Sequence, residues 1–145
     1  MEKCEDNVLE CYLEEIAQYP PLSREEELEL NRRIMAGEDC SRRLVEGNLR
    51  LVIDMARRST CYGISLVELI EAGNAALIRA AERYRPDPES RFIHYASKFI
   101  RQAIVRAIAE TPREHRIPVR TVERINRIVK IQRRLMKELG QEPTV

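Results

Sequence analysis

The side chains best suited to bind a metal ion or attack a substrate, the thiols and the imidazoles, are scattered along the chain. Neither the C-x-x-C spacing of a zinc site nor a cysteine beside a histidine occurs. We therefore expect no metal site and no cofactor, and we expect free cysteines in a reducing cytoplasm. The residues concerned are Cys4, Cys11, Cys40, Cys61, His94 and His115.

Carboxylates occur in runs, and paired carboxylates can transfer protons in an active site. The runs at Glu14–Glu15 and Glu25–Glu27 fall on helix faces that the surrounding pattern predicts to be exposed, where Glu is simply a good helix former. The chain also lacks the G-x-S-x-G, P-loop and H-E-x-x-H motifs. The sequence therefore predicts that the protein is not an enzyme.

Arginine is the residue type that points to a partner. The chain has 25 basic residues, nearly all of them Arg, and the guanidinium fork suits phosphates and base edges better than an ammonium does. Residues 1–50 carry 7 basic and 13 acidic side chains, residues 51–100 carry 7 and 6, and residues 101–145 carry 11 and 5. This gradient predicts a nucleic-acid surface in the C-terminal half, although a helical surface rich in solvated charge would have the same composition.

Helices must position these side chains, because apolar residues recur at helical spacing and runs of β-branched residues are nearly absent. The 145 residues are 43% hydrophobic and 34% charged, which is enough for a core and a densely charged surface. No stretch is long and apolar enough for a membrane span, and the acidic N-terminus is unlike a signal peptide. We expect an all-α fold with helices over residues 7–19, 23–36, 39–58, 65–84, 92–109 and 118–139, and a Pro-rich loop at 85–90.

Helix ends carry recognisable signals. Ser23 with Glu26, and Ser65 with Glu68, have the spacing of a capping box, in which a hydroxyl and a carboxylate three residues later satisfy each other's backbone amides. Gly37 directly follows the last periodic residue of its helix, where a left-handed conformation commonly ends the helix.

Four collinear segments are distinctive: LVEGNLRLVI at 44–53, ELIEAGN at 68–74, FIRQAI at 99–104 and RIPV at 116–119. In this order and at these separations they resemble the bacterial sigma-70 family of RNA polymerase initiation factors. The resemblance covers nearly the whole chain and corresponds to the family's regions 1.2 and 2 and the start of region 3. It implies a sigma region 2-like multi-helix bundle at residues 1–112 and a truncated start of region 3 at residues 113–145, and we expect a fragment or a naturally short relative.

The resemblance implies a polymerase-binding surface on one helix. In relatives the matching helix docks on the clamp helices of the polymerase's largest subunit, and the matching residues here are Glu68, Glu71, Asn74 and Ile78. The family usually has a carboxamide and then a carboxylate where this chain has Glu71 and Ala72, so one polar contact is moved or lost. A capped amphipathic helix with an exposed acidic edge is the alternative interpretation.

The resemblance also implies that the next helix holds unpaired promoter DNA. In relatives its aromatic side chains trap a flipped adenine of the −10 element; Phe92 and Tyr95 match those positions, and Arg91 matches a backbone contact. Arg101 and Gln102 match the upstream edge of the element, and Gln suits adenine. The other DNA-binding positions on this helix are Lys98, Phe99 and Arg106.

Further DNA-binding positions lie outside that helix. Asn48 and Leu51 match part of a pocket for a second flipped base. Arg113 and Arg116 match backbone contacts near the duplex fork. Arg120, which replaces a common His, and Glu123 match the region that reads an extended −10 element, where a carboxylate can accept a hydrogen bond from cytosine.

Several departures from the family bear on strand opening. An aromatic residue has become Ser90, a Trp-Trp pair has become Lys98-Phe99, and two threonines have become His94 and Val105. Loss of the first Trp removes the wedge that replaces the flipped base in the stack.

The aromatic residues themselves have a second interpretation. Helical spacing also places Phe92 and Tyr95 on the buried stripe of their helix. We expect Tyr95 to lie at the wet edge of that stripe and to stack on a base, and we expect Phe99 to lie mostly in the core.

Two functions of different kinds fit these features. The first is the promoter-melting half of a divergent sigma factor, which binds core RNA polymerase and the non-template strand of the −10 element. The second is a degenerate sigma-like module that docks on polymerase without opening DNA, and the residues Ser90, Lys98 and Val105 favour it. A basic helical protein without a polymerase partner fits less well. An anti-sigma or other regulatory protein is a further expected partner, and a membrane is not.

Overall fold

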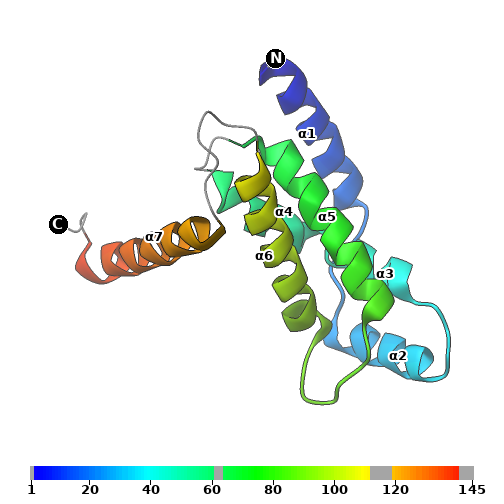
Figure 1. Ribbon diagram of the computed structural model, residues 1–145. Coiled ribbons are helices and arrows are strands. Elements are labelled where there is room, and N and C mark those ends of the chain that lie inside the picture. Colours follow the sequence, from blue (N-terminus) through cyan, green and yellow to red (C-terminus); the bar gives the residue numbers. More distant parts are fainter. Residues whose placement is uncertain (1, 61–63, 112–118, 141–145) are drawn as a thin grey trace. The chain divides into compact units, whose positions relative to one another are not determined.

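The computed structural model describes residues 2–60, 64–111 and 119–140, with side chains described at 7–60, 64–111 and 120–140. Within these ranges the chain is helical, as predicted, and the only strand-like pairing is one antiparallel bridge between Asp87 and Ser90. No described helix is long and apolar enough to cross a lipid bilayer. The helices, shown in Figure 1, are α1 (Glu2–Ala17), α2 (Arg24–Met35), α3 (Ser41–Glu46), α4 (Leu49–Arg57), α5 (Leu66–Arg83), α6 (Phe92–Glu110) and α7 (Val119–Leu139).

The chain forms two compact units, Met1–Ile104 and Val105–Val145. The first unit contains α1 to α5 and most of α6, and the second contains the end of α6 and α7.

The two predicted capping boxes are confirmed. Ser23 Oγ accepts from Glu26 N at 3.2 Å while Glu26 Oε2 accepts from Ser23 N at 2.9 Å, and the Ser65–Glu68 pair repeats the arrangement at 3.2 and 3.3 Å. Gly37 has a φ of +91°, so the chain reverses there as the sequence predicts.

The prediction of a single helix over residues 39–58 is wrong. The segment forms two helices, α3 and α4, with a break at Gly47 and Asn48. Asn48 Nδ2 donates a 2.7 Å hydrogen bond to Leu44 O, the carbonyl that a continuous helix would pair with the backbone amide of residue 48. Leu22 packs so close to Gly47 that a β-carbon there would collide with its side chain. The break therefore has both a hydrogen-bonding and a packing cause.

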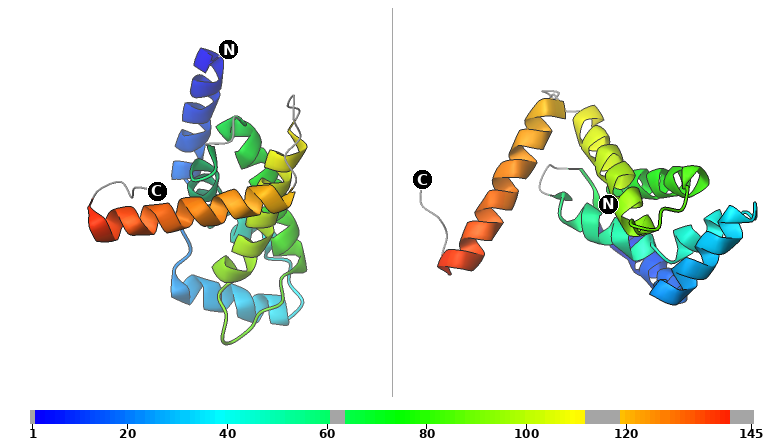
Figure 2. Two further views of the ribbon diagram at one scale, coloured as in Figure 1. Left: turned by 60° about the vertical axis from the view of Figure 1, so that its left-hand side comes forward. Right: turned by 90° about the horizontal axis from the view of Figure 1, so that it is seen from below.

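The core of the first unit is centred on α5, which packs against α3 and α4 and lies beside α6 and α1 (Figures 1 and 2). Gly73 marks the closest approach: a β-carbon built there would lie 2.6 Å from Val52 Cγ1 of α4 and 3.5 Å from Ile100 Cγ2 of α6. Three helices can meet at this point because Gly73 has no side chain. The largest fully buried side chains of this unit are Leu44, Val52, Leu69, Leu77, Phe92 and Ile100.

The loop predicted at 85–90 is present between α5 and α6. Asp87 Oδ1 accepts a 2.9 Å hydrogen bond from Glu89 N, and Ser90 N donates to Asp87 O at 3.4 Å. This Asp-centred turn closes the loop and delivers the chain to the first residue of α6, Phe92.

In the second unit α7 is an amphipathic helix that ends at Leu139, and Gly140 follows with a φ of +66°. The predicted start at Pro118 lies outside the described residues. Several apolar side chains of α7 are exposed. The helix carries many cations, and one of them, Arg134, forms a 3.1 Å ion pair with Glu138. The exposed apolar residues are Ile128, Ile131, Met136 and Leu139.

Candidate functional site

A buried carboxylate ties α2 to the start of α6. Glu27 is only 5% exposed; its Oε2 accepts from Arg91 Nε at 2.8 Å and from Arg91 Nη2 at 2.7 Å, and its Oε1 accepts from Phe92 N at 2.8 Å. The prediction that the 25–27 carboxylates are all solvated is therefore wrong for Glu27. Its helical register gave the missing signal, because it lies three and seven residues before Leu30 and Ile34 on the inward face of α2.

The Glu27 contact fixes where α6 begins. The first backbone amides of a helix have no partner within the helix, and a carboxylate there is favoured by the helix dipole. Phe92 is the first residue of α6, so Glu27 supplies from another helix the cap that the local sequence lacks.

Four aromatic rings lie in contact beside this cap. The ring of Tyr84, 3% exposed, lies edge-on to Phe92 with centroids 4.9 Å apart and contacts Tyr95 at 5.5 Å; Tyr95 in turn contacts Phe99 at 5.0 Å. Phe92, one of the two predicted base-capture residues, is 1% exposed and belongs to the core. Tyr84 was not predicted as a site residue, although it continues the buried stripe of α5 seven residues after Leu77.

Burial raises the pKa of the Tyr84 hydroxyl, and the nearby Glu27 carboxylate raises it further. The ring that supports Tyr95 is therefore neutral over the physiological pH range. Its support of Tyr95 is apolar.

Tyr95 and Phe99 are half-buried, and they lie on the same edge of α6. The two side chains fall in the same intermediate range of exposure, so the expected contrast between a wet Tyr95 and a core Phe99 is not seen in their burial. The buried row of α6 runs through Phe92, Ala96 and Ile100, whereas Tyr95 and Phe99 occupy the neighbouring row, where each side chain is only partly buried.

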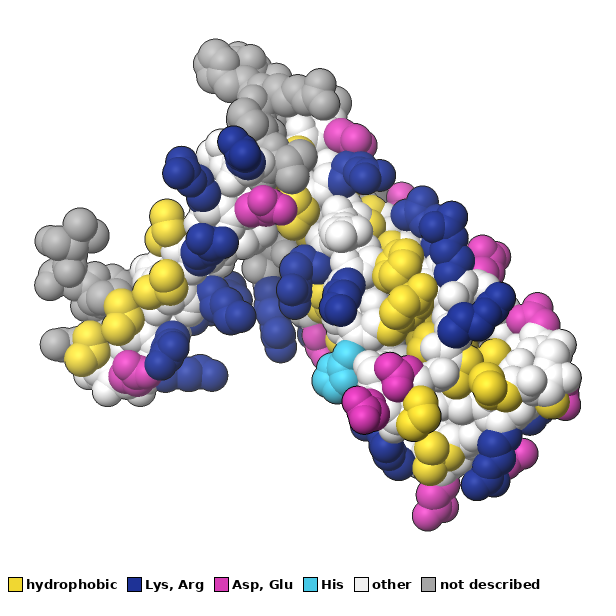
Figure 3. All heavy atoms as spheres, turned by 60° about the horizontal axis from the view of Figure 1, so that its bottom comes forward, with side chains coloured by type: hydrophobic (Ala, Val, Ile, Leu, Met, Phe, Trp, Pro, Cys, Tyr) yellow, Lys and Arg dark blue, Asp and Glu magenta, His cyan; other side chains and the backbone are white. Residues whose placement is uncertain are grey.

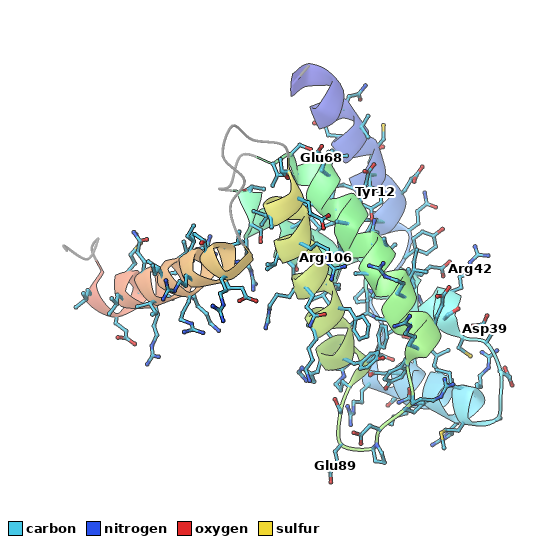
Figure 4. All side chains as sticks on the ribbon, in the orientation of Figure 1. Tyr12, Asp39, Arg42, Glu68, Glu89 and Arg106 are labelled. Atoms are coloured by element: carbon cyan, nitrogen blue, oxygen red, sulfur yellow. The ribbon has the colours of Figure 1, made fainter. Side chains whose placement is uncertain are left out.

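The solvent-facing side of α6 is basic and amide-bearing. Lys98, Arg101 and Gln102 are exposed, and neither cation forms an ion pair with a described residue of the chain. Figure 3 shows Lys and Arg side chains gathered on both sides of a band of hydrophobic side chains. Arg106 is also exposed, on the part of α6 that belongs to the second unit (Figure 4).

The remaining predicted DNA-binding residues lie elsewhere. Asn48 and Leu51 are half-buried at the turn into α4, and the amide of Asn48 is bonded to Leu44 O as described above. Arg120 and Glu123 are exposed on the first turns of α7 in the second unit. Arg113 and Arg116 lie outside the described residues.

The predicted polymerase-binding surface is only partly assembled on one face of α5. Glu71 and Ile78 are exposed, and Glu68, also exposed, is the N3 residue of the capping box. Asn74 instead turns toward α1, where its Nδ2 donates a 2.8 Å hydrogen bond to Tyr12 Oη. Figure 4 shows Glu68 in the first turn of α5 and Tyr12 on α1, the helix beside it.

The described residues contain no group of His, Cys, Asp and Glu side chains placed to hold a metal ion. Cys11 is exposed and Cys40 is buried, and both are free thiols. The candidate site on α6 consists of aromatic rings, cations and the Gln102 amide.

Comparison with known proteins identifies two family models that match the chain. Residues 7–39, which contain most of α1 and all of α2, match the family model "Sigma-70 factor, region 1.2", and residues 44–114 match "Sigma-70 region 2". Together the two models cover α2 and α4–α6. These helices meet at Glu27, at Gly73 and at the contacting rings of Tyr84, Phe92, Tyr95 and Phe99.

Full-length relatives show the same similarity. The chain is 48% identical over 134 residues to RNA polymerase sigma factor SigA of a Bacillus species, 45% identical over 139 residues to SigA of Clostridium acetobutylicum, and 41% identical over 143 residues to SigA of Lactococcus lactis subsp. cremoris. These alignments cover 92%, 95% and 96% of this chain but 36%, 37% and 39% of the relatives. The chain belongs to the sigma-70 family of RNA polymerase sigma factors.

Proposed function

We propose that this chain is a transcription initiation factor, not an enzyme, which binds core RNA polymerase and holds the −10 element of promoter DNA. The observation that carries the proposal is the edge of α6, where the half-buried Tyr95 and Phe99 rings lie beside Lys98 and Arg101, two exposed cations that form no ion pair with any described residue. Rings that stack with bases and cations that follow phosphates are the two components of a single-strand binding surface.

The exposed side of Tyr95 is the proposed platform for the flipped adenine on the non-template strand. Its other side is supported by Tyr84 and Phe99, so the ring is held in place before DNA arrives. A stacked base returns about 1–3 kcal/mol, which is comparable to the few kcal/mol that unstacking a base requires. Phe92 contributes by packing beneath the platform, because it is itself buried.

Gln102 is the proposed reader of the upstream edge, since its amide can pair with adenine in two hydrogen bonds. Lys98 occupies the position of a family Trp, and a flexible ammonium cannot replace a ring as a wedge in the duplex. We therefore propose that this chain holds an opened strand and that opening depends on the polymerase complex. Exposed Arg106, Arg120 and Glu123 are proposed to contact the adjoining duplex.

The outer face of α5 is the proposed surface for the clamp helices of the polymerase's largest subunit. Glu71 offers a carboxylate to a basic partner, and Ile78, which is 47% exposed, offers an apolar contact seven residues later on the same face. Family membership and sequence identity along nearly the whole chain support a role in transcription initiation over that of a degenerate module that docks on polymerase without opening DNA.

The test is to titrate a complex of the whole chain and core polymerase with a fluorescent single strand that carries a −10-like sequence, and with a strand of the same composition in scrambled order. We expect at least tenfold tighter binding of the −10-like strand. Equal affinity for the two strands would contradict sequence recognition, and failure of the chain to co-elute with core polymerase would contradict docking.

A further inference from the structure

The guanidinium of Arg91 already has an anionic partner. Both Nε and Nη2 lie within 2.8 Å of Glu27 Oε2, and the second oxygen of the same carboxylate accepts from Phe92 N. Both oxygens of this carboxylate thus accept hydrogen bonds from the residues at the start of α6.

The two partners differ in their access to solvent. The Arg91 side chain is 39% exposed, whereas that of Glu27 is 6% exposed. A phosphate oxygen could therefore reach Arg91 from outside, but Glu27 could not exchange its partner for water. Separating the pair would leave a buried carboxylate without its counter-charge, which is strongly unfavourable.

We propose that Glu27 is a positioning residue that holds the start of α6 and, with the same carboxylate, competes with DNA phosphate for Arg91. A carboxylate and a phosphate present similar pairs of oxygens to a guanidinium fork, so one can stand in for the other. The proposal deepens the proposed function, on which its DNA-binding part rests.

The consequence is an uneven contribution of the basic residues along α6. Lys98 and Arg101 have no ion-pair partner among the described residues and are free to neutralise phosphates. Arg91, although it directly precedes Phe92, adds little until its contact with Glu27 is removed. Glu27 thereby reduces the contribution of phosphate contacts by Arg91 to binding, close to the proposed base platform at Tyr95.

The experiment uses Glu27→Gln, which removes the charge but keeps an oxygen to accept from Phe92 N. Binding of the whole chain to a scrambled single strand is measured over a range of salt concentrations, because the slope of log K against log salt counts neutralised phosphates at about 0.7 each for single strands. We expect the slope of E27Q to steepen by about 0.7 and its affinity at 0.1 M salt to rise about three- to fivefold.

Matched variants separate this effect from a general change in charge. Glu29→Gln removes a carboxylate from the same helix, but one whose partner is the exposed Arg32, so its slope should equal that of the parent. Arg91→Gln should leave the parent slope unchanged and should cancel the gain in the E27Q background. Arg101→Gln should make the parent slope shallower by about 0.7. An unchanged slope in E27Q, or a loss in R91Q as large as that in R101Q, would overturn the proposal.

A second measurement needs no DNA. In ¹⁵N nuclear magnetic resonance spectra of the parent, the Arg91 Nε–H and the Phe92 amide should exchange slowly with solvent, and in E27Q only the Phe92 amide should stay protected. A protected Arg91 Nε–H in E27Q would refute the proposal even if the chain bound no DNA. Absence of DNA binding by the parent in complex with core polymerase would instead count against the proposed function alone.

Discussion

Asn74 donates a 2.8 Å hydrogen bond from its side-chain amide to the hydroxyl of Tyr12, which precedes it by 62 residues. The bond joins α1 to α5 on the side of α5 next to the proposed polymerase surface. Asn74 therefore has a structural task within the free chain. The face that remains for a partner is defined by Glu71 and Ile78.

Replacing Tyr12 with Phe removes this hydroxyl and leaves the part-buried Asn74 amide without its acceptor. We expect a loss of about 1–2 kcal/mol in the free energy of unfolding, measured by thermal or urea denaturation. Tyr19→Phe, a change of the same type at a half-buried position after α1, should cost much less. Equal effects of the two changes would show that the bond to Asn74 does not stabilise the contact between α1 and α5.

Alkaline pH should weaken the same contact. Burial raises the pKa of Tyr12 above the ordinary value of 10.0, although the bond with Asn74 opposes this, and burial likewise raises the pKa of Tyr84. A raised folded-state pKa means that the unfolded chain loses its proton first, so stability is fully present below pH 10 and falls as the pH rises above it. The melting temperature should fall less between pH 9 and pH 11 in Tyr12→Phe and in Tyr84→Phe than in the parent. An identical fall in all three proteins would contradict the assignment.

Gly73→Ala tests the three-helix contact at the centre of the first unit. The new β-carbon would lie 2.6 Å from Val52 Cγ1, well inside van der Waals contact, so α4 and α5 would have to separate. Overpacking of this kind costs about 1–3 kcal/mol, which exceeds the helix-propensity gain of about 1 kcal/mol from Gly to Ala. Denaturant unfolding measures the net effect. Adding Val52→Ala should recover part of the loss, and no recovery would argue against a clash at this site.

Local features were predicted well from the sequence because their causes are local. The capping boxes at Ser23 and Ser65 and the reversal at Gly37 depend on residues within four positions of one another. The amphipathic pattern likewise placed α5 and α6 within one or two residues of their observed ends.

Features caused by distant residues were missed. Leu22 limits the space at Gly47 from outside the broken helix, and Tyr12 withdraws Asn74 from the face that helical spacing assigns to it. The burial of Glu27 depends on Arg91 and Phe92, 64 and 65 residues away, and a run of three glutamates does not reveal which of them has such partners. The sequence thus indicated which residue types form the candidate site. It did not indicate which of these residues are free to bind a partner.

Reversing the charge of Glu71 tests docking on polymerase. Glu71 is exposed and has no structural contact among the described side chains, so Glu71→Arg should leave the melting temperature nearly unchanged while it opposes a basic partner surface. We expect at least a tenfold loss of affinity for core polymerase in a pull-down titration. Glu68→Arg is a poorer test because it also breaks the capping box. Glu14→Arg on α1 is the control for net charge, and a loss as large in that variant would place docking elsewhere.

The sharpest prediction separates the two aromatic residues that match the base-capture positions. Phe92 is buried against Tyr84, and its truncation to Ala should cost about 3–5 kcal/mol of stability. Tyr95 is only partly buried, so Tyr95→Ala should lower stability much less but weaken binding of the −10-like strand by about 1–3 kcal/mol. Melting curves give the first quantity, and titrations with core polymerase present, expressed per folded molecule, give the second. Phe99→Ala should lie between them, since the Phe99 ring is half-buried and supports Tyr95 from one side. If Tyr95→Ala unfolds the chain while the affinity per folded molecule stays that of the parent, Tyr95 is part of the core, and the edge of α6 is not where the base is held.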